Sequence, residues 1–440
     1  MKVYMKTFGC QMNVHDSERI EEILMRAGFE MVEDPAFADV ALVNSCTVRE
    51  KAWHKAISEA GRLRKPKERH GRQLVVGMLG CVAQQEGERI FSLVSGMDLV
   101  VAPDHYHRLP ALIRQCAADG QRQVAVGFDA GHPEDFLALS EAVAAPISAF
   151  VTVMKGCEER CLYCIVPSVR GPERHRPLDD IEGEVRRLVA GGTQEVTLLG
   201  QKVNAWREGE HSFADLLARL DNIEGLLRLR FTSPHPRHMS PEVARAFGSL
   251  RTLCEAIHLP AQSGSDRTLK RMRRRYRVDD YLATVTALRA ARPDIAISTD
   301  LIVGYPGETE EDFAQTLALV EAVRFSGAFS FKYSVRPGTP AEKLGDDVSE
   351  AEKASRLSRL HEVVLRHEQA FRAQQLGRTL EVLVEGQGRM PRQWSGRARN
   401  NQIVNFTCPS DVCDPALRGQ LVRVAITRVN PNSLEGEWHP

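Results

Sequence analysis

Three cysteines in the stretch GCEERCLYC follow the spacing C-x3-C-x2-C, which is typical of metal ligation. A structural zinc site closes with four protein ligands, whereas three thiolates on a 4Fe-4S cluster leave one iron open to bind a small molecule. No matching Cys or His pair lies beside the triplet in sequence. We therefore predict that Cys157, Cys161 and Cys164 hold a 4Fe-4S cluster with an open iron, and structural zinc is the alternative interpretation.

Three further cysteines, Cys10, Cys46 and Cys81, each stand just after a predicted strand. A lone cysteine in that position is more often a small buried residue. The carboxyl ends of parallel strands share one edge of an open sheet, and that edge is where such sheets bind ligands. Three cysteines in equivalent positions therefore indicate one joint site.

The first hundred residues alternate short apolar runs with helical patterns, which predicts a parallel sheet built from βαβ units. The strands are expected at 1–9, 38–44, 73–79 and 97–102, and the helices at 16–27, 48–64 and 83–95.

A second series of six βα units predicts a partial (β/α)6 barrel. Its strands are expected at 149–155, 195–200, 227–232, 256–261, 295–304 and 329–334, and its helices near 179–190, 212–221, 240–248, 279–291 and 309–323. The active site of such a barrel lies at the carboxyl ends of its strands. Because Cys157 directly follows the first of these strands, the cysteine triplet is expected at the mouth of the barrel.

At 440 residues the chain is too long for one hydrophobic core, so we expect several domains. The prediction is an α/β domain at 1–117, a connector at 118–142, the barrel at 143–373 and a last domain at 374–440. A long polar helix at about 349–375 leads into this last domain, whose alternating pattern predicts a small all-β, OB-like barrel.

The overall composition is that of an ordinary globular protein, with 43% hydrophobic and 26% charged residues. Lys plus Arg equals Asp plus Glu at 58 each, so the net charge favours neither a nucleic acid nor a membrane as partner. No apolar run approaches the ~20 residues of a membrane helix, and no secretory signal precedes the first strand. We expect a cytoplasmic protein without a membrane partner. In that reducing compartment the remaining cysteines are expected to be structural or incidental: Cys116, Cys254, Cys408 and Cys413.

The stretch GCEERCLYCIVPSVRG resembles the radical S-adenosylmethionine signature. The resemblance implies that the open iron chelates the amino and carboxylate groups of S-adenosylmethionine, and that one electron then releases a 5′-deoxyadenosyl radical. Together with TFGCQMN, NSCTVREKA and GMLGCVAQQEGE, the signature resembles the methylthiotransferase family over nearly the whole chain. That family implies a second 4Fe-4S cluster on Cys10, Cys46 and Cys81, whose open iron holds the sulfur to be transferred. The closing β segment resembles the TRAM domain, which binds RNA in this family.

Within the family, TFGCQMN, NSCTVREKA, GQKVNAW and HLPAQSGSD are most similar to the branch that acts on N6-isopentenyladenosine in tRNA. The implied reaction replaces the C2 hydrogen of that base, next to the anticodon on its 3′ side, by a methylthio group. S-adenosylmethionine would serve twice, as methyl donor and as radical source, and a flavodoxin-like reductant would feed electrons to a monomeric enzyme. Lys202, where the family usually has Asn, and an extra Pro234 depart from the family pattern near the barrel mouth.

Three alternatives remain open. Other branches of the family modify an aspartate of a ribosomal protein or threonylcarbamoyladenosine in tRNA, and the stretch around Cys10 disfavours them. A non-catalytic iron-sulfur protein that binds RNA is the alternative from another class.

Contacts to S-adenosylmethionine are expected from two glycine-bearing stretches. GGTQEVTLLG, with Gly191, Gly192 and Glu195, resembles the strand that receives the methionyl amine, although Gly-Gly also simply ends a helix. Gly304 follows the fifth barrel strand, where adenosine packs in the family, although Pro-Gly is equally a turn signal.

Contacts to RNA are expected from a basic run and from the last domain. RTLKRMRRRYR at 267–277 carries seven basic residues and no acid, with Tyr276 available to stack on a base. A solvated helix face and a polar hairpin are the alternatives for the two segments. The predicted RNA contacts are Arg271, Arg273, Arg274, Arg275, Arg397, Arg399, Asn400 and Asn401.

Overall fold

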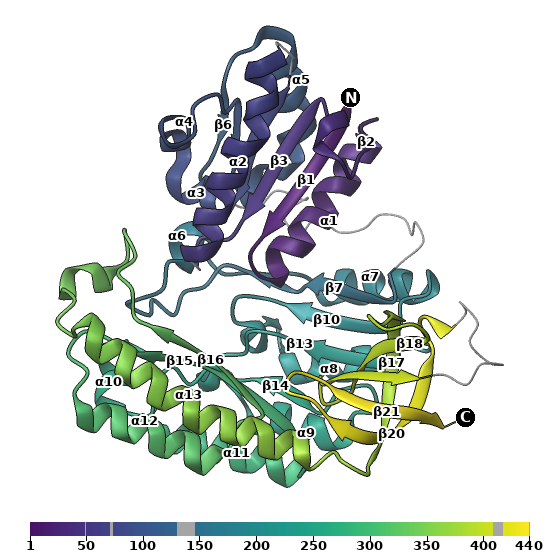
Figure 1. Ribbon diagram of the computed structural model, residues 1–440, viewed down its shortest axis with the longest axis vertical. Helices are drawn as coiled ribbons and strands as arrows, with labels where there is room; N and C mark the ends of the chain where they lie inside the picture. The colour runs from purple at the N-terminus through teal and green to yellow at the C-terminus, as the bar shows by residue number, and fades with distance from the viewer. Residues whose placement is uncertain (49, 71–73, 130–145, 408–416, 440) are drawn as a thin grey trace.

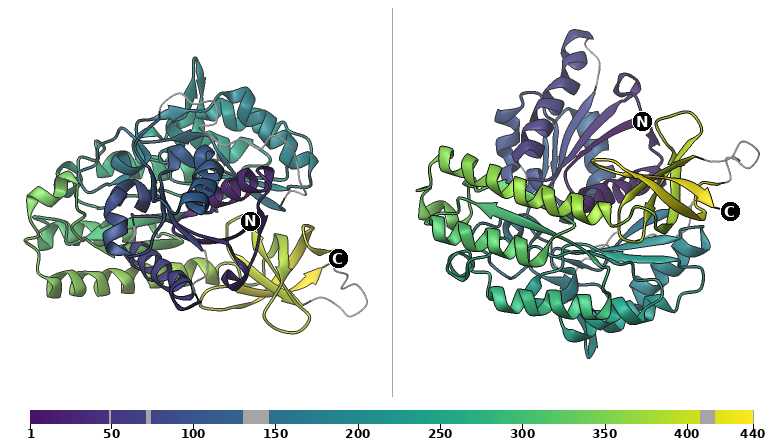
Figure 2. Two further views of the ribbon diagram at one scale, coloured as in Figure 1. Left: turned by 90° about the horizontal axis from the view of Figure 1, so that it is seen from above. Right: turned by 60° about the horizontal axis from the view of Figure 1, so that its bottom comes forward.

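The computed structural model contains three structural units (Figure 1). It describes residues 1–48, 50–70, 74–129, 146–407 and 417–439. An α/β unit at the amino end stands on an open barrel of strands, and a small closed barrel at the carboxyl end packs beside the open one (Figures 1 and 2). The predicted fold class is confirmed, whereas the exact domain limits stay predictions. Most of the predicted connector, 130–142, lies outside the described residues.

The α/β unit contains a six-stranded parallel sheet in the order β2-β1-β3-β4-β5-β6. Its strands are β1 (Lys2–Phe8), β2 (Glu30–Met31), β3 (Val40–Ser45), β4 (Val75–Gly80), β5 (Leu99–Val101) and β6 (Gln123–Ala125). Its helices are α1 (Gln11–Arg26), α2 (Glu50–His70), α3 (Cys81–Glu86), α4 (Ile90–Leu93) and α5 (Leu109–Asp119). Four of these strands were predicted. The edge strand β2 was missed, and β6 lies in the segment predicted as a connector.

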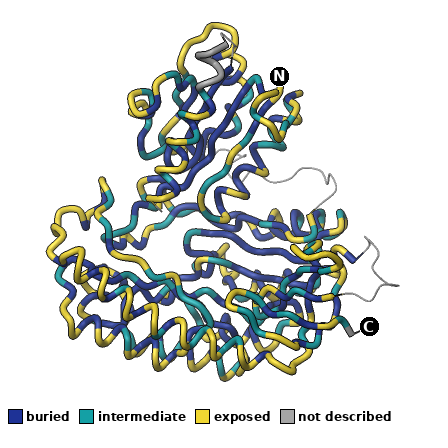
Figure 3. The backbone as a smooth tube through the Cα atoms, viewed as in Figure 1, coloured by how far each residue is buried: buried dark blue, intermediate teal, exposed yellow. Residues whose placement is uncertain are grey.

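Helices cover both faces of this sheet. Residues of α1 and α5 form one apolar cluster with the strands, and residues of α2, α3 and α4 form a second cluster on the other face. Every residue of β3 and β4 is buried (Figure 3). Strands that are buried on both faces have nearly continuous apolar sequences, and VALVN and VVGML in this chain follow that pattern.

The open barrel consists of two three-stranded parallel sheets, β13-β10-β7 and β14-β15-β16, joined by a parallel bridge between Leu229 and Leu253. Its strands are β7 (Ser148–Thr152), β10 (Glu195–Leu199), β13 (Arg228–Phe231), β14 (Ala256–His258), β15 (Ala296–Val303) and β16 (Gly327–Lys332). Its outer helices are α7 (Leu178–Ala190), α8 (Phe213–Asp221), α9 (Pro241–Ser249), α11 (Val278–Ala291), α12 (Glu310–Val323) and α13 (Glu350–Ala373). This arrangement confirms the predicted six-unit partial barrel.

Short elements connect the barrel units. They are β8 (Met154–Lys155), α6 (Val166–Arg170), β9 (Arg174–His175), β11 (Arg207–Glu208), β12 (His211–Ser212) and α10 (Asp266–Arg271).

The small barrel closes in the strand order β17-β18-β19-β21-β20. Its strands are β17 (Thr379–Gln387), β18 (Gln393–Ala398), β19 (Ile403–Thr407), β20 (Leu421–Val429) and β21 (Leu434–His439). Two arginines of β13 attach it to the open barrel. Arg228, which is fully buried, donates to the backbone oxygens of Arg397 and Glu381, and Arg230 donates to those of Ala398 and Arg399.

Candidate functional site

The three amino-terminal cysteines lie at adjacent strand ends of the α/β unit. Cys10 follows β1 and caps α1, Cys46 directly follows β3, and Cys81 begins α3 after β4. The register pairs the last residue of each strand with its neighbour, Phe8 with Ser45 and Ser45 with Gly80. The structure thus brings together three thiols that are far apart in sequence. We call Cys10, Cys46 and Cys81 the sheet-edge site; their role as ligands stays a prediction.

Two glycines allow this close approach. Gly9 has φ +142°, and a Cβ on it would lie 2.5 Å from Cys46 Cβ. Gly80 has φ +88°, and a Cβ on it would collide with the side chain of Asn44. Both positions combine a backbone conformation that favours glycine with a lack of space for any side chain. The sheet edge can therefore present its cysteines close together only because glycine precedes Cys10 and Cys81.

Asparagines tie the strand ends to α1. The Asn44 amide donates to the backbone oxygen of Asn13 at 2.9 Å and to Ser17 Oγ at 2.9 Å, while Asn13 donates to Asn44 Oδ1 at 3.3 Å. A hydrogen bond between Cys10 and Cys46 lowers the pKa of Cys10 to about 6 and raises that of Cys46. One thiol of the site is therefore ready to ionise at neutral pH, as a thiolate ligand requires.

An arginine from the barrel unit contacts the sheet-edge site. Arg170, at the end of α6, donates from Nε to Cys81 Sγ at 3.1 Å and from Nη2 to Asp16 Oδ2 at 2.7 Å. Its side chain is 4% exposed, and its Nη1 is buried with no partner among the described residues. Sequence reasoning missed this residue, although it lies inside the quoted signature, six positions after Cys164.

The cysteine triplet follows β8 in a loop at the barrel mouth, and we call Cys157, Cys161 and Cys164 the loop site. Burial, together with the neighbouring Cys161 and Cys157, raises the pKa of Cys164 to about 12. Burial is also the main cause that raises the pKa of Cys157, to which Cys161 adds. Because these thiols shift one another's pKa, they lie close together, as predicted. Their role as ligands stays a prediction.

A second buried arginine contacts the loop site. Arg274 donates from Nη1 to Cys161 Sγ at 3.6 Å and from Nη2 to the backbone oxygen of Pro260 at 3.2 Å. It also packs over the ring of Tyr276, whose hydroxyl donates to the backbone of Ala261. The predicted roles of Arg274 in gripping phosphate and of Tyr276 in stacking on a base do not fit this burial. Both side chains pack inward beneath the cysteine loop.

An ion-pair network anchors the loop site. Lys202 Nζ lies 2.7 Å from Glu173 Oε2 and 3.3 Å from Glu159 Oε1, and Glu159 lies between Cys157 and Cys161 in the loop. His238 and Arg237 also contact Glu159, at 2.7 and 3.3 Å. Glu159, His235 and His238 are close enough to share a metal ion, but two cationic side chains already neutralise this carboxylate. Lys202, which stands where the family usually has Asn, thus has a structural role.

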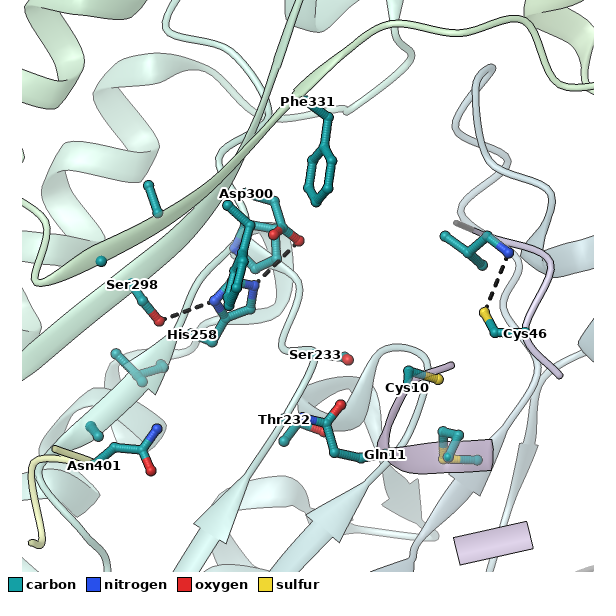
Figure 4. Close-up of a pocket in the computed structure, with 18 of the residues that line it drawn as sticks. Cys10, Gln11, Cys46, Thr232, Ser233, His258, Ser298, Asp300, Phe331 and Asn401 are labelled. Carbon is teal, nitrogen blue, oxygen red and sulfur yellow. Dashed lines mark hydrogen bonds and ion pairs between the residues drawn. The ribbon is translucent and has the colours of Figure 1, made fainter. Parts of the chain in front are cut away.

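One cavity of about 1860 Å³ is lined by all three units. Cys10, Cys46, Cys81 and Cys164 line it, so thiols of both sites face the same space. Cys10 and Cys46 lie on one side, and His258 with its partners Ser298 and Asp300 lies across the cavity (Figure 4). His258 Nδ1 is 3.0 Å from Ser298 Oγ, and His258 Nε2 is 3.2 Å from Asp300 Oδ2.

Two exposed phenylalanines of β16 form an apolar wall of the same cavity. Phe329 is 55% exposed and Phe331 39% exposed, and Phe331 points into the cavity (Figure 4). This wall, together with His258, Ser298 and Asp300 beside it, can accept a flat ring with an apolar substituent.

The residues predicted to contact S-adenosylmethionine are separated by the fold. Gly191 and Gly192 lie between α7 and β10, and Glu195 begins β10, at the end of the barrel opposite the cysteine loop. Glu195 accepts there from Arg230 at 2.9 Å. Glu195 nevertheless lines the same cavity as Cys164, whereas Gly191 and Gly192 are not among its lining residues. Gly304 follows the carboxyl end of β15 as expected, and the side chain of Lys353 packs on its Cα.

The residues predicted to contact RNA fall into two groups. Arg271, Arg273 and Arg275 are exposed, as an RNA contact requires. In the small barrel Arg399 is held by Glu255 at 2.8 Å and belongs to the junction with the open barrel. The rest of this group line the cavity: Arg397, Asn400 and Asn401. These contacts stay predictions, and for Arg399 the structure provides a protein partner in place of RNA.

Two of the remaining cysteines are buried in structural settings. Cys116 and Cys254 donate to backbone oxygens of Asp98 and Thr252. Cys408 and Cys413 lie outside the described residues.

Three family models match the three units. Residues 151–320 match the radical SAM superfamily, residues 2–102 the uncharacterized protein family UPF0004, and residues 373–438 the TRAM domain. A protein of Geobacter metallireducens named tRNA-2-methylthio-N(6)-dimethylallyladenosine synthase is 48% identical over 99% of this chain and 98% of its own length. A protein of Agrobacterium fabrum with the same name is 44% identical over 99% and 97%. This chain belongs to the radical SAM methylthiotransferase family.

A solved structure supports the fold of this methylthiotransferase. The radical S-adenosylmethionine methyltransferase TsrM of Kitasatospora setae, with cobalamin and a [4Fe-4S] cluster bound, superposes with a TM-score of 0.57. The match covers 77% of this chain and 73% of TsrM at 14% identity, so it concerns the fold alone.

The cofactors of this methylthiotransferase are S-adenosylmethionine and 4Fe-4S clusters. The residues present fit two such clusters, because each site offers three grouped thiols and a buried arginine that donates to sulfur. None of the helices in the described part of the chain has the length and apolar character needed to cross a bilayer.

Proposed function

We propose that this chain converts N6-isopentenyladenosine, next to the anticodon of tRNA on its 3′ side, to 2-methylthio-N6-isopentenyladenosine. One observation carries the proposal: the three thiols of the sheet-edge site and Cys164 of the loop site line a single cavity large enough for a nucleotide. Relatives of 44% and 48% identity over 99% of the chain bear the name of this activity.

The chemistry explains why two cysteine sites are needed. A C2 hydrogen of adenine is too weakly acidic for any side-chain base at neutral pH. When bound, the clusters and S-adenosylmethionine supply the one-electron chemistry, the sulfur and the methyl group that side chains lack. In this proposal Cys157, Cys161 and Cys164 hold the radical-forming cluster, and the sheet-edge site holds the sulfur-bearing one. S-adenosylmethionine is used twice in each turnover.

The chain itself positions the base and excludes water. Arg228 and Arg230 seal the small barrel against the amino end of β13, which closes one side of the cavity. We place the adenine between the two sites, with its isopentenyl group against the apolar wall of Phe329 and Phe331. Excluding water protects a reactive carbon radical from side reactions.

The partners follow from the same proposal. Asn400 and Asn401 line the cavity, and the exposed Arg271, Arg273 and Arg275 offer positive charge to phosphates of the anticodon stem-loop. A flavodoxin-like reductant delivers the electron. The enzyme acts as a cytoplasmic monomer.

The test uses the reconstituted full chain with S-adenosylmethionine, sulfide and a reductant. Anticodon stem-loops with and without the N6-isopentenyl group are the two substrates, and mass spectrometry measures the methylthio nucleoside. We expect product on the isopentenylated RNA alone. Product on a threonylcarbamoylated stem-loop or on a ribosomal protein, with none on the isopentenylated RNA, would assign another branch of the family. Iron and RNA binding without 5′-deoxyadenosine would identify a non-catalytic protein.

A further inference from the structure

Arg170 belongs to the barrel unit in sequence but contacts the α/β unit in space. It ends α6, directly beyond the loop that carries Cys164. Its guanidinium reaches across to Cys81 Sγ at 3.1 Å and to Asp16 at 2.7 Å. The segment that carries the loop site therefore also supplies a charged donor to the sheet-edge site.

The guanidinium of Arg170 retains an unused donor. Its Nη1 is buried and has no partner among the protein atoms that the structure describes. An unpaired charged donor in the interior is strongly unfavourable, so such a group usually marks a place where another acceptor binds. The nearest chemistry offered by the site is sulfur, because Nε of the same side chain already donates to a thiol.

We propose that Arg170 is a positioning residue for the sheet-edge cluster, with Nε donating to the Cys81 thiolate and Nη1 donating to a further sulfur atom bound at the site. The inference rests on the proposed function, because it assumes a cluster on Cys10, Cys46 and Cys81. Hydrogen bonds to cluster sulfurs are among the factors that set reduction potential. A cationic donor stabilises the more negative, reduced cluster, so Arg170 raises the midpoint potential of the sheet-edge cluster.

The competing explanation is that Arg170 only clamps two units together through Asp16. The chain offers a matched control for that explanation. Arg19 also forms a buried ion pair across the same junction, with Glu184 at 2.8 Å, and its described contacts include no sulfur. Arg19→Gln removes an ion pair between units, whereas Arg170→Gln removes an ion pair and donors to sulfur.

The experiment measures each cluster separately in the reconstituted full chain. A Cys161→Ala background leaves only the sheet-edge cluster, and a Cys46→Ala background leaves only the loop cluster. Midpoint potentials come from redox titration followed by electron paramagnetic resonance, and iron and sulfide analysis reports cluster content. Arg170→Gln, Arg170→Lys and Arg19→Gln are compared in both backgrounds.

We expect Arg170→Gln to lower the midpoint potential of the sheet-edge cluster by about 60 mV, a tenfold change in the one-electron equilibrium. Arg170→Lys, which keeps the charge beside Asp16 but loses the fork of donors, should fall between Arg170→Gln and wild type. Arg19→Gln should leave both potentials unchanged, and the loop cluster should not respond to Arg170→Gln.

An unchanged sheet-edge potential in Arg170→Gln, or an equal shift in Arg19→Gln, would overturn the proposal. If neither Arg170 variant assembles the sheet-edge cluster while the loop cluster and Arg19→Gln are normal, the holding role is supported directly. A wild-type protein with two clusters but no methylthio product would refute the proposed function and leave this measurement interpretable.

Discussion

The two cysteine sites reach similar arrangements by different routes. The loop site takes its thiols from one short segment, whereas the sheet-edge site takes them from the ends of three strands held in register. Each receives one buried arginine donor, Arg274 at 3.6 Å and Arg170 at 3.1 Å. The loop site therefore depends on local anchoring, and the sheet-edge site depends on the packing of a whole unit. Substitutions at one site should therefore affect its cluster more than the cluster of the other site.

Removing one ligand from each site should have the largest effect. We expect about eight irons per reconstituted chain, from two four-iron clusters, and about half of that in Cys46→Ala and in Cys161→Ala. Both variants should lose the methylthio product. Only Cys161→Ala should lose 5′-deoxyadenosine, because only the loop site is proposed to cleave S-adenosylmethionine.

Iron analysis and chromatography of 5′-deoxyadenosine test the predictions for these two variants. An unchanged iron content in Cys46→Ala would remove the sheet-edge site from the proposal. Loss of 5′-deoxyadenosine in both variants would mean that the two sites do not act separately.

A methyl group at the sheet edge should disrupt one site and spare the other. In Gly9→Ala the new Cβ would lie 2.5 Å from Cys46 Cβ, so Cys10 and Cys46 must move apart. We expect loss of the sheet-edge iron, about half of the total, with 5′-deoxyadenosine formation retained. Gly28→Ala is the control, because Gly28 has φ +83° and no atom within 4 Å of the new Cβ.

The control separates backbone strain from collision, since both substitutions place alanine at positive φ, where the strain is roughly 1–2 kcal/mol. Equal iron loss in Gly9→Ala and Gly28→Ala would show that strain alone destabilises the unit. Full iron content in Gly9→Ala would show that the strand ends tolerate separation.

Sequence predicted the features that follow from strand order. A cysteine after each of three parallel strands must lie at one edge of the sheet, so the sheet-edge site could be predicted without coordinates. The cysteine triplet follows the first barrel strand, so its position at the carboxyl ends of the barrel strands could be predicted in the same way. The partners Arg170 and Arg274 could not be predicted in this way, because which side chain faces a cysteine depends on how units and loops pack.

The errors have equally specific causes. Gly191, Gly192 and Glu195 precede or begin β10, so they lie away from the carboxyl end of that strand, and of the three Glu195 alone lines the cavity. The strands β2 and β6 have two and three residues, too few for an alternating pattern to appear. Arg274 lies in a basic run, and composition cannot distinguish an arginine that is buried from one that is exposed.

Breaking the anchor of the loop site should have a moderate effect. Lys202 is buried, with 6% of its side chain exposed, between Glu159 and Glu173. Removing one partner of a buried ion pair typically costs about 3 kcal/mol. We expect Lys202→Met to lower the free energy of unfolding by about that amount and to speed chelation of the loop-site iron, measured in urea titrations and chelator assays.

An exposed ion pair supplies the control. Lys332 pairs with Glu350 at 2.7 Å, but the two side chains are 40% and 70% exposed, and such pairs contribute about 0–1 kcal/mol. Lys332→Met should therefore change little. If Lys202→Met releases iron from the sheet-edge site as fast as from the loop site, the inference that the loop site depends on local anchoring is contradicted.

Acid should weaken the loop-site anchor through Glu173, with the smallest effect of the series. Burial alone would raise the pKa of Glu173, but hydrogen bonds from His175 and Lys202 lower it to about 2, below its ordinary value of 4.5. A carboxyl group whose pKa is lowered on folding stabilises the protein above about pH 4.5, and this contribution is lost as the pH falls toward 2. Glu173→Gln should therefore lose less stability than wild type between pH 6 and pH 3, measured as unfolding free energy of the cluster-free protein. Equal losses in the two proteins would mean that Glu173 does not supply the acid sensitivity of this anchor.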